Sequence, residues 1–273
     1  MTNNIKTLDS QYIANTYSRY PVQIVDGEGS ILTDENGKHY IDLGSGIGVN
    51  IFGQKDPAWI EAVQTQLHRF QHTSNLYSSA PDAELAEFLC ERTGLKKVFF
   101  SNSGAEANEC AIKAARAYAA AKKGKEWSTI VTLRDSFHGR TLTTLAATGQ
   151  DMFHQDFLPL TPGFVHAEPD DLEGNRVAGI LIECVQGEGG VRALSDAYVK
   201  GVAELCEKED IVFMTDEVQC GNGRTGKLYA YEHYGVLPDV VSTAKGLGGG
   251  LPIGATMLGM KVENVFTPGK NGS

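Results

Sequence analysis

Two ionisable residues stand directly after apolar segments that have the composition of buried strands. Asp216 follows IVFMT (211–215), and Lys245 follows DVVSTA (239–244). A lasting negative charge at the end of a buried strand needs a cationic partner. A lysine that cannot reach bulk water loses its proton more readily and is suited to form a Schiff base with an aldehyde. Taken singly, a helix-capping aspartate and a surface lysine are the alternatives.

A third segment, SNSGAEANE (101–109), follows the strand candidate KKVFF (96–100) and opens a helical pattern. Ser103, Gly104 and Ala105 place small residues at the helix start, where free amide groups favour an anion such as a phosphate. A plain N-cap is the alternative.

A fourth segment, DSFHGRT (135–141), follows the strand candidate at 129–133. Phe137 offers a face that stacks on a planar ring, and Arg140 offers a two-pronged clamp for a carboxylate. His138 is placed to hydrogen-bond near such a ring. A core phenylalanine, a solvated arginine and a structural histidine are the alternatives for these three residues.

Placed on one sheet, the four segments are no longer independent coincidences. A phosphate cradle, a ring stacker, an acid for a ring nitrogen and an aldehyde-trapping lysine are the groups that pyridoxal 5′-phosphate requires. The sequence therefore predicts this cofactor.

The elements that must position these residues alternate along the chain. Strand candidates at 96–100, 129–133, 178–183, 211–216 and 239–244 are separated by segments with helical periodicity, at 82–94, 105–121 and 196–208. This order predicts an α/β fold with a mainly parallel sheet, helices on both faces, and a ligand crevice at the carboxyl ends of the strands.

The chain before this pattern differs in character. Residues 22–43 alternate around the turn signals Asp26-Gly27 and Glu35-Asn36-Gly37, which predicts a small antiparallel unit. We expect two regions, an N-terminal segment over 1–75 and a large cofactor-binding domain over 76–273.

Composition restricts the class of protein. The 273 residues are 41% hydrophobic and carry a formal net charge of −10, which argues against general binding to nucleic acid or anionic lipid. There is no apolar run of membrane-spanning length and no signal-peptide pattern, so a cytoplasmic protein is expected. The five cysteines lack a C-x-x-C pair, so neither a disulfide framework nor a metal site is indicated.

Two glycine-rich strings imitate nucleotide motifs. GNGRTG (221–226) begins five residues after the strand end at 216, and Leu228 stands where a phosphate loop needs Ser or Thr. A glycine-rich surface loop is the preferred interpretation. GLGGGLPIG (246–254) marks a place where backbone approaches something closely.

The ordered strings SNSGAEANE, FHGRTL, QGEGGV, DEVQCGNGRTG and AKGLGGGLPIGA resemble the class III, fold-type I, pyridoxal-phosphate-dependent aminotransferases, in particular their acetylornithine branch. The resemblance runs from the first residues to the last. It implies catalytic roles for Lys245, which holds the cofactor, and for Asp216, which pairs with the pyridine nitrogen.

The same resemblance implies the remaining site residues. It assigns the phosphate, ring and neighbouring contacts of the cofactor to Ser103, Gly104, Ala105, Phe137, Glu217, Val218 and Gln219. It assigns the α-carboxylate of the substrate to Arg140, supporting positions behind the ring to Glu183 and His138, and further substrate contacts to Glu188, Asn50 and Ser273.

The implied reaction moves the δ-amino group of N-acetylornithine to 2-oxoglutarate in a homodimer with shared active sites. Ornithine, succinylornithine and 4-aminobutyrate aminotransferases are alternatives within the class, and an inactive truncated binding subunit is the alternative outside it. Because the family continues beyond the position of Ser273 with a C-terminal domain, the resemblance also leads us to expect a fragment that is inactive alone.

Overall fold

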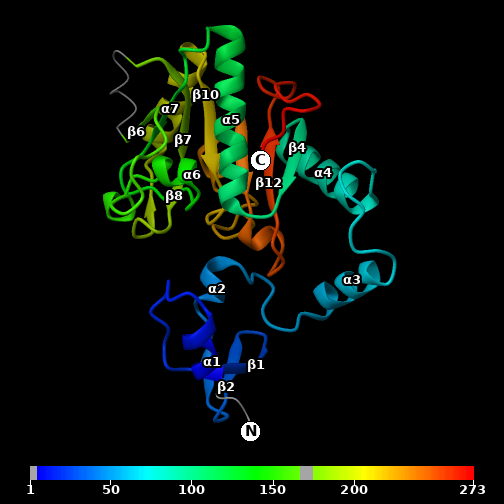
Figure 1. The fold of residues 1–273 in the computed structure, drawn as a ribbon. Helices are drawn as coiled ribbons and strands as arrows, with labels where there is room; N and C mark the ends of the chain where they lie inside the picture. Colours follow the sequence, from blue (N-terminus) through cyan, green and yellow to red (C-terminus); the bar gives the residue numbers. More distant parts are fainter. Residues whose placement is uncertain (1–4, 167–174) are drawn as a thin grey trace. The chain divides into compact units, whose positions relative to one another are not determined.

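The structure is a computed structural model that describes residues 5–166 and 175–273. The chain folds into two compact units, Met1–His72 and Thr73–Ser273, and the ribbon of each is drawn in Figure 1. Each unit has a sheet of its own.

The N-terminal unit contains a three-stranded antiparallel sheet, as the sequence predicts. Its elements are α1 (Ile5–Tyr12), β1 (Ile24–Glu28), β2 (Ile31–Asp34), β3 (His39–Ile41), α2 (Ser45–Gly48) and α3 (Pro57–Leu67). The turn predicted at Glu35-Asn36-Gly37 is present, and Gly37 adopts a φ of +79° there. The turn predicted at Asp26-Gly27 is wrong: both residues lie inside β1, next to a register shift, and the chain reverses at Gly29.

The larger unit contains a seven-stranded sheet in the order β4-β12-β11-β10-β7-β5-β6. The strands are β4 (Lys97–Ser101), β5 (Thr129–Thr132), β6 (Phe164–His166), β7 (Val177–Ile182), β10 (Val212–Asp216), β11 (Val240–Thr243) and β12 (Gly254–Leu258). A separate hairpin pairs β8 (Val185–Gln186) with β9 (Arg192–Ala193). The five predicted strands are all present, and their pairings are parallel wherever two of them are neighbours.

The strand β12 was not predicted, and it makes the sheet mixed. It lies between β4 and β11 and is antiparallel to both. The glycine run before it hides the strand signal, because glycine is depleted in strands. Close backbone approach explains the glycine at its start: a Cβ at Gly254 would lie 2.3 Å from the carbonyl oxygen of Ser103.

The helices of the larger unit are α4 (Ala80–Thr93), α5 (Gly104–Lys122), α6 (Leu142–Ala147) and α7 (Asp196–Lys208), with short 3₁₀ turns η1 (Asp151–Phe153), η2 (Ala230–Tyr234) and η3 (Lys245–Leu247). The three predicted helices are present, and α6 is the one that the sequence did not predict. Gly94 ends α4 in the left-handed conformation, as its position predicts.

Helices cover both faces of the sheet. Along β7, Leu181 packs in a cluster with α5, whereas Ile180 and Ile182 pack in a second cluster with α7. Because successive strand residues point to opposite faces, α5 and α7 must lie on opposite sides. Figure 1 shows α5 as the long helix running beside β10 and β12.

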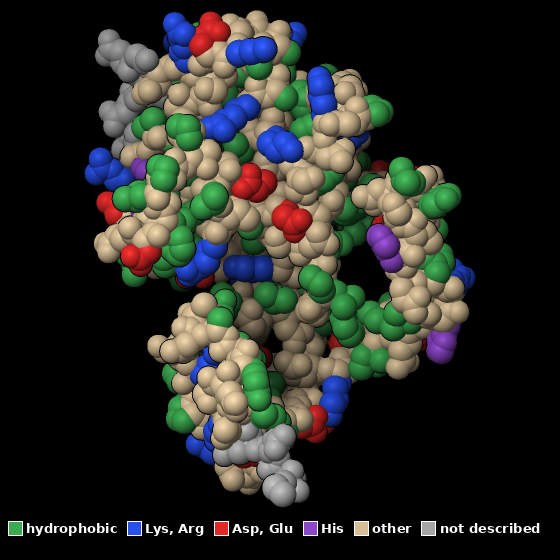
Figure 2. Space-filling model, viewed as in Figure 1, with side chains coloured by type: hydrophobic (Ala, Val, Ile, Leu, Met, Phe, Trp, Pro, Cys, Tyr) green, Lys and Arg blue, Asp and Glu red, His purple; other side chains and the backbone are tan. Residues whose placement is uncertain are grey.

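The surface carries charges of both signs. On the face shown in Figure 2, basic and acidic side chains are interspersed over the larger unit. Within residues 5–166 and 175–273, none of the helices combines the length and apolar character that crossing a bilayer requires.

Candidate active site

Strand alternation aims Asp216 at the helix α5. In β10, Val212 and Met214 pack in the cluster that contains α5, and Phe213 packs in the cluster that contains α7. Asp216 shares the parity of Val212 and Met214, so it faces α5. Its hydrogen bond to Asn108, on α5, confirms this direction.

Three donors surround the Asp216 carboxylate. Its Oδ2 accepts from Asn108 Nδ2 at 2.7 Å and from His138 Nδ1 at 2.8 Å, and its Oδ1 accepts from the amide of Val218 at 3.0 Å. An ionised carboxylate only accepts, so His138 carries a proton on Nδ1. The side chains of Asp216, Asn108 and His138 are all buried. The site therefore holds a fixed negative charge that is available to a protonated ring nitrogen.

Lys245 is the second residue after the end of β11 and has a strained backbone conformation. Its φ is +48°, in the left-handed region that non-glycine residues seldom adopt and that costs about 1–3 kcal/mol. Burial lowers the pKa of its ammonium group, while the negative charges of Asp216 and Glu188 oppose that shift. Among the described residues Lys245 has no ion pair. These are the conditions for a reactive amine.

The GNGRTG loop holds the chain on which Lys245 stands. Asn222, itself in the left-handed region, donates from Nδ2 to Thr243 Oγ1 at 3.0 Å and to the carbonyl of Ala244 at 2.9 Å. The loop thus fixes the end of β11, and no immediate strand-to-helix turn of a nucleotide site exists there. The sequence pattern alone gave this loop no such role.

The start of α5 has the features of an anion site. The Ser103 hydroxyl accepts from the Glu106 amide at 3.2 Å and donates to its carboxylate, so it acts as the N-cap. The amides of Gly104 and Ala105 lie in the first turn, which has no partners within the helix. A Cβ at Gly104 would lie 2.6 Å from Val218 Cγ1, so only glycine allows this approach.

The loop with Phe137 packs onto that helix start. Gly139 has a φ of +136°, and a Cβ there would lie 2.9 Å from the Cβ of Ala105. The Phe137 ring meets Phe153 edge-on at 5.9 Å, and the exposed Arg140 guanidinium lies 4.7 Å from the centre of the Phe153 ring. The ring stacker and the phosphate cradle are therefore neighbours, and Arg140 is free of carboxylate partners among the described residues.

Glu183 supports the same loop from the end of β7. Its Oε2 accepts from the Phe137 amide at 2.9 Å. Burial raises its pKa to about 7, with the charge of Asp216 acting in the same direction and His138 opposing it. Gln219 lies over the QGEGG loop, since a Cβ at Gly187 would overlap its side-chain amide.

Glu217 points away from Asp216. Its two carboxylate oxygens accept from the amides of Ala230 and Tyr231, at 2.8 and 2.9 Å, and Cys220 donates its thiol to one of them. Burial raises the pKa of Glu217 to about 7. Its carboxylate is thus committed to η2, and a cofactor contact by Glu217 stays a prediction.

Three further residues are predicted to contact the substrate. Glu188 is exposed but close enough to Lys245 to affect the pKa of that amine. Ser273 lines a cleft beside the edge strand β4, together with residues 74–79. Asn50 belongs to the N-terminal unit. Their roles in substrate binding remain predictions.

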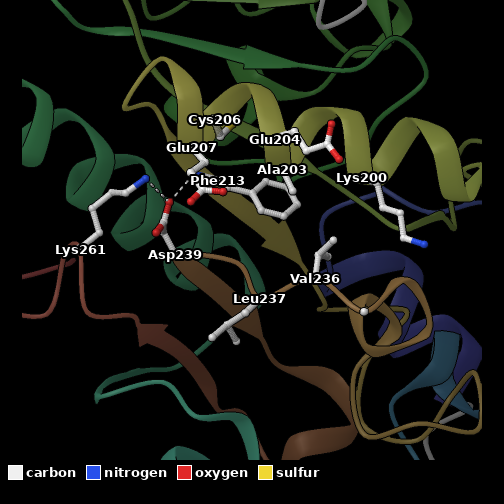
Figure 3. A pocket seen from close by; sticks show the side chains of 11 residues that line it. Lys200, Ala203, Glu204, Cys206, Glu207, Phe213, Val236, Leu237, Asp239 and Lys261 are labelled. Carbon is white, nitrogen blue, oxygen red and sulfur yellow. Dashed lines mark hydrogen bonds and ion pairs between the residues drawn. The ribbon is translucent and has the colours of Figure 1, made fainter.

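A second cleft lies elsewhere in the larger unit. It measures about 590 Å³ and lies between α7 and the loop after η2, and Figure 3 shows its lining. Lys261 Nζ lies 2.9 Å from Asp239 Oδ2 beside it. None of the predicted cofactor residues lines this cleft. Among the described residues no group of three His, Cys, Asp or Glu side chains is arranged to hold a metal.

The residues present fit pyridoxal phosphate. The glycine-lined start of α5 fits a phosphate, the buried Asp216 anion fits a protonated pyridine, and Lys245 is an amine without an ion partner. Together with the sheet topology, these features define a fold-type I pyridoxal-phosphate enzyme.

Comparison with known proteins supports that class. Residues 12–273 match the class-III aminotransferase family. The chain is 50% identical to acetylornithine aminotransferase of Haemophilus ducreyi, over 100% of this chain and 71% of that protein. It is 46% identical to succinylornithine transaminase of Salmonella paratyphi A, over 96% of this chain and 66% of that protein.

A solved structure shares the fold of this chain. An ornithine aminotransferase of Toxoplasma gondii that contains pyridoxal phosphate at its active site aligns with a TM-score of 0.92 and 31% identity, over 100% of this chain and 67% of that one. The chain belongs to the class III aminotransferases, and its cofactor is pyridoxal phosphate. It spans between 66% and 71% of the length of these three relatives.

Proposed function

We propose that the active site of this chain, as part of an active homodimer, transfers the δ-amino group of N-acetylornithine to 2-oxoglutarate. The observation that carries the proposal is that Lys245, half-buried and without an ion pair among the described residues, lies close enough to the buried Asp216 for that carboxylate to affect its pKa. The 50% identity to an acetylornithine aminotransferase, over the whole of this chain, supports N-acetylornithine as the substrate.

When bound, pyridoxal phosphate supplies an electron sink that stabilises negative charge on the substrate carbon. Asp216, whose carboxylate is held in place by Asn108, His138 and the Val218 amide, would pair with the ring nitrogen and favour a proton on it. Lys245 Nζ would hold the cofactor through its aldehyde group, and the same amine would move a proton at the substrate carbon that bears the reacting amine.

Arg140 sets which amine reacts. Its guanidinium is exposed and rests on the Phe153 ring, next to Phe137. Bidentate binding of the substrate α-carboxylate there directs the distal amine towards Lys245. We further propose a cytoplasmic homodimer with Asn50, Glu188 and Ser273 at the substrate site, on the strength of the family resemblance.

N-succinylornithine is the second candidate substrate, since a succinylornithine transaminase is 46% identical to the chain. A panel of N-acetylornithine, N-succinylornithine, ornithine and 4-aminobutyrate, each with 2-oxoglutarate, tests the choice. N-acetylornithine should give the highest kcat/KM. A higher value for another donor would replace the substrate, and absence of turnover with all four donors would favour a binding subunit.

Arg140→Lys tests the positioning argument. Lysine keeps the charge but loses the second prong, so KM for N-acetylornithine should rise about tenfold or more, with cofactor affinity unchanged. Steady-state kinetics and a cofactor titration measure both. Loss of cofactor with unchanged KM would move Arg140 from the substrate site to the phosphate site.

A further inference from the structure

Asn108 is a polar residue on the buried face of α5. Its side chain is 1% exposed, and its helical neighbours on that face include Ala107 and Ala111. Asparagine disfavours a helix interior relative to alanine, and a buried amide is costly unless its groups are hydrogen-bonded. Its presence at this position therefore has to be explained by its bonds.

Every hydrogen-bonding group of the Asn108 side chain contacts a different segment of the site. Nδ2 donates to Asp216 Oδ2 at 2.7 Å and to the carbonyl oxygen of His138 at 2.8 Å. Oδ1 accepts from the Ser242 hydroxyl, on β11. The amide thus joins α5, the loop after β5, β10 and β11.

The orientation of the amide follows from these partners. If the amide were flipped, Asn108 Oδ1 would face Asp216 Oδ2 and the His138 carbonyl, which are both acceptors. The Ser242 hydroxyl can donate or accept, so the two acceptors at the other end of the amide decide its orientation, and in that orientation Ser242 donates to Oδ1. Asn108 therefore presents only donor hydrogens to Asp216.

We propose that Asn108 is a positioning residue that holds the Asp216 carboxylate oriented towards the ring nitrogen. Asn108 Nδ2 and His138 Nδ1 both reach Asp216 Oδ2, at 2.7 and 2.8 Å, so this oxygen is held from two sides. Because Oδ1 is held by the Val218 amide, the carboxylate is also prevented from rotating. The inference rests on the proposed pairing of Asp216 with the cofactor.

The competing explanation is that Asn108 only ties α5 to the sheet. A neighbouring bond already does so: Thr256 Oγ1, on β12, donates to the carbonyl of Ala107 at 2.8 Å, in the same buried layer. Thr256→Val removes that tie without touching Asp216. It is the matched control for a purely structural effect.

The experiment compares Asn108→Asp, Ser242→Ala, Thr256→Val and Asp216→Asn. Pyridoxal phosphate is titrated into each cofactor-free protein to obtain its Kd and visible spectrum, and kcat, KM and the thermal midpoint are measured. Asn108→Asp has the same size but places an acceptor against Asp216. It should weaken cofactor binding about tenfold and lower kcat about a hundredfold, with KM for N-acetylornithine changed less than about threefold.

Ser242→Ala should also weaken cofactor binding and lower kcat, but less than Asn108→Asp does, because the Asn108 amide loses its hydrogen bond from the Ser242 hydroxyl. Thr256→Val should lower the thermal midpoint and leave kcat and the spectrum unchanged. If Asn108→Asp matches Thr256→Val in kcat and Kd, or if it fails to fold and Ser242→Ala keeps normal kcat and Kd, the proposal is overturned. Normal activity of Asp216→Asn would instead sink the assignment of Asp216 itself.

Discussion

An aspartate and a lysine lie near each end of β11, and the two pairs differ in how their charges are balanced. At the amino end, Asp239 lies 2.9 Å from Lys261, each side chain is about one-fifth exposed, and Asp239 also accepts from the amide of Phe213. Figure 3 shows this pair. At the carboxyl end, Lys245 has no ion pair among the described residues, and Asp216 is satisfied by other donors.

This difference distinguishes a lysine that stabilises the fold from a lysine that is prepared to react. Lys261 has its charge balanced and donates further to the carbonyl of Ile211, so it closes the edge of the β10–β11 layer. Lys245 is half-buried on a strained backbone, and its partial burial lowers its pKa. A lysine whose charge the fold leaves unbalanced is the one prepared to react with an aldehyde.

The largest expected effect comes from removing the unbalanced lysine. Lys245→Ala should abolish transamination and the borohydride-reducible link to pyridoxal phosphate, whereas Lys261→Ala should keep both. Reduction followed by peptide mapping measures the link. A pyridoxyl group on a lysine other than Lys245 would contradict the assignment of Lys245 as the reactive lysine.

Asp216→Asn should give the second largest effect. The amide supplies no charge, so the ring nitrogen is not held protonated, and kcat should fall about a hundredfold or more while the protein still folds. Circular dichroism and single-turnover kinetics separate folding from chemistry. Turnover near the normal rate would show that Asp216 is a structural acceptor for Asn108 and His138.

Much of this site could be predicted from the sequence because its residues follow local patterns. Asp216 and Lys245 each end an apolar strand, and Gly104 opens a helix with small neighbours, so period and position alone bring them to one edge. The same logic could not find Asn108 or Ser242. Their role depends on which face of α5 meets β10 and β11, which is tertiary information.

The sequence did not predict those parts of the fold in which a short element is stabilised mainly by its neighbours. β12 has little strand signal of its own, but both of its edges are hydrogen-bonded, to β4 and β11. Likewise, the direction of Glu217 depends on the loop that brings Ala230 and Tyr231 to it. The resemblance assigned Asp216 and Glu217 to one site, yet Glu217 follows the end of β10 and its carboxylate binds the amides of η2.

Glu217 predicts how the stability of the folded protein depends on pH. Its folded pKa of about 7 lies above the ordinary value of 4.5, so the folded protein holds a proton that the unfolded chain releases. The stability that this proton contributes is complete below pH 4.5 and is lost as pH rises to about 7, by about 3 kcal/mol at most. Urea unfolding at about pH 5 and about pH 8, on either side of that loss, measures it.

Glu217→Gln should flatten that dependence, because glutamine does not titrate. The remaining slope should combine a loss of stability from Glu183, whose pKa is also raised to about 7, with an opposite contribution from His166, whose pKa is lowered by burial. The activity of Glu217→Gln should change little, since its contacts are with η2. A slope identical to that of the unaltered protein would show that Glu217 is ionised throughout in the folded state.

The smallest effect is expected from Asp239→Asn, the same chemical change as Asp216→Asn at the opposite end of the sheet. Asparagine still accepts from the Phe213 amide, so only the attraction to Lys261 is lost. Because both side chains are one-fifth exposed, the loss should cost about 1–2 kcal/mol of unfolding free energy.

Cofactor affinity and kcat should stay unchanged in Asp239→Asn, because the pair lines the cleft beside α7 and touches none of the predicted cofactor residues. Lys261→Met, which keeps the apolar stem, should destabilise similarly, and the double variant should cost less than the two single changes added together. Urea unfolding of the four proteins gives this coupling. Additive costs would mean that the 2.9 Å pair contributes no stability, and a fall in kcat would mean that the two ends of β11 are not independent.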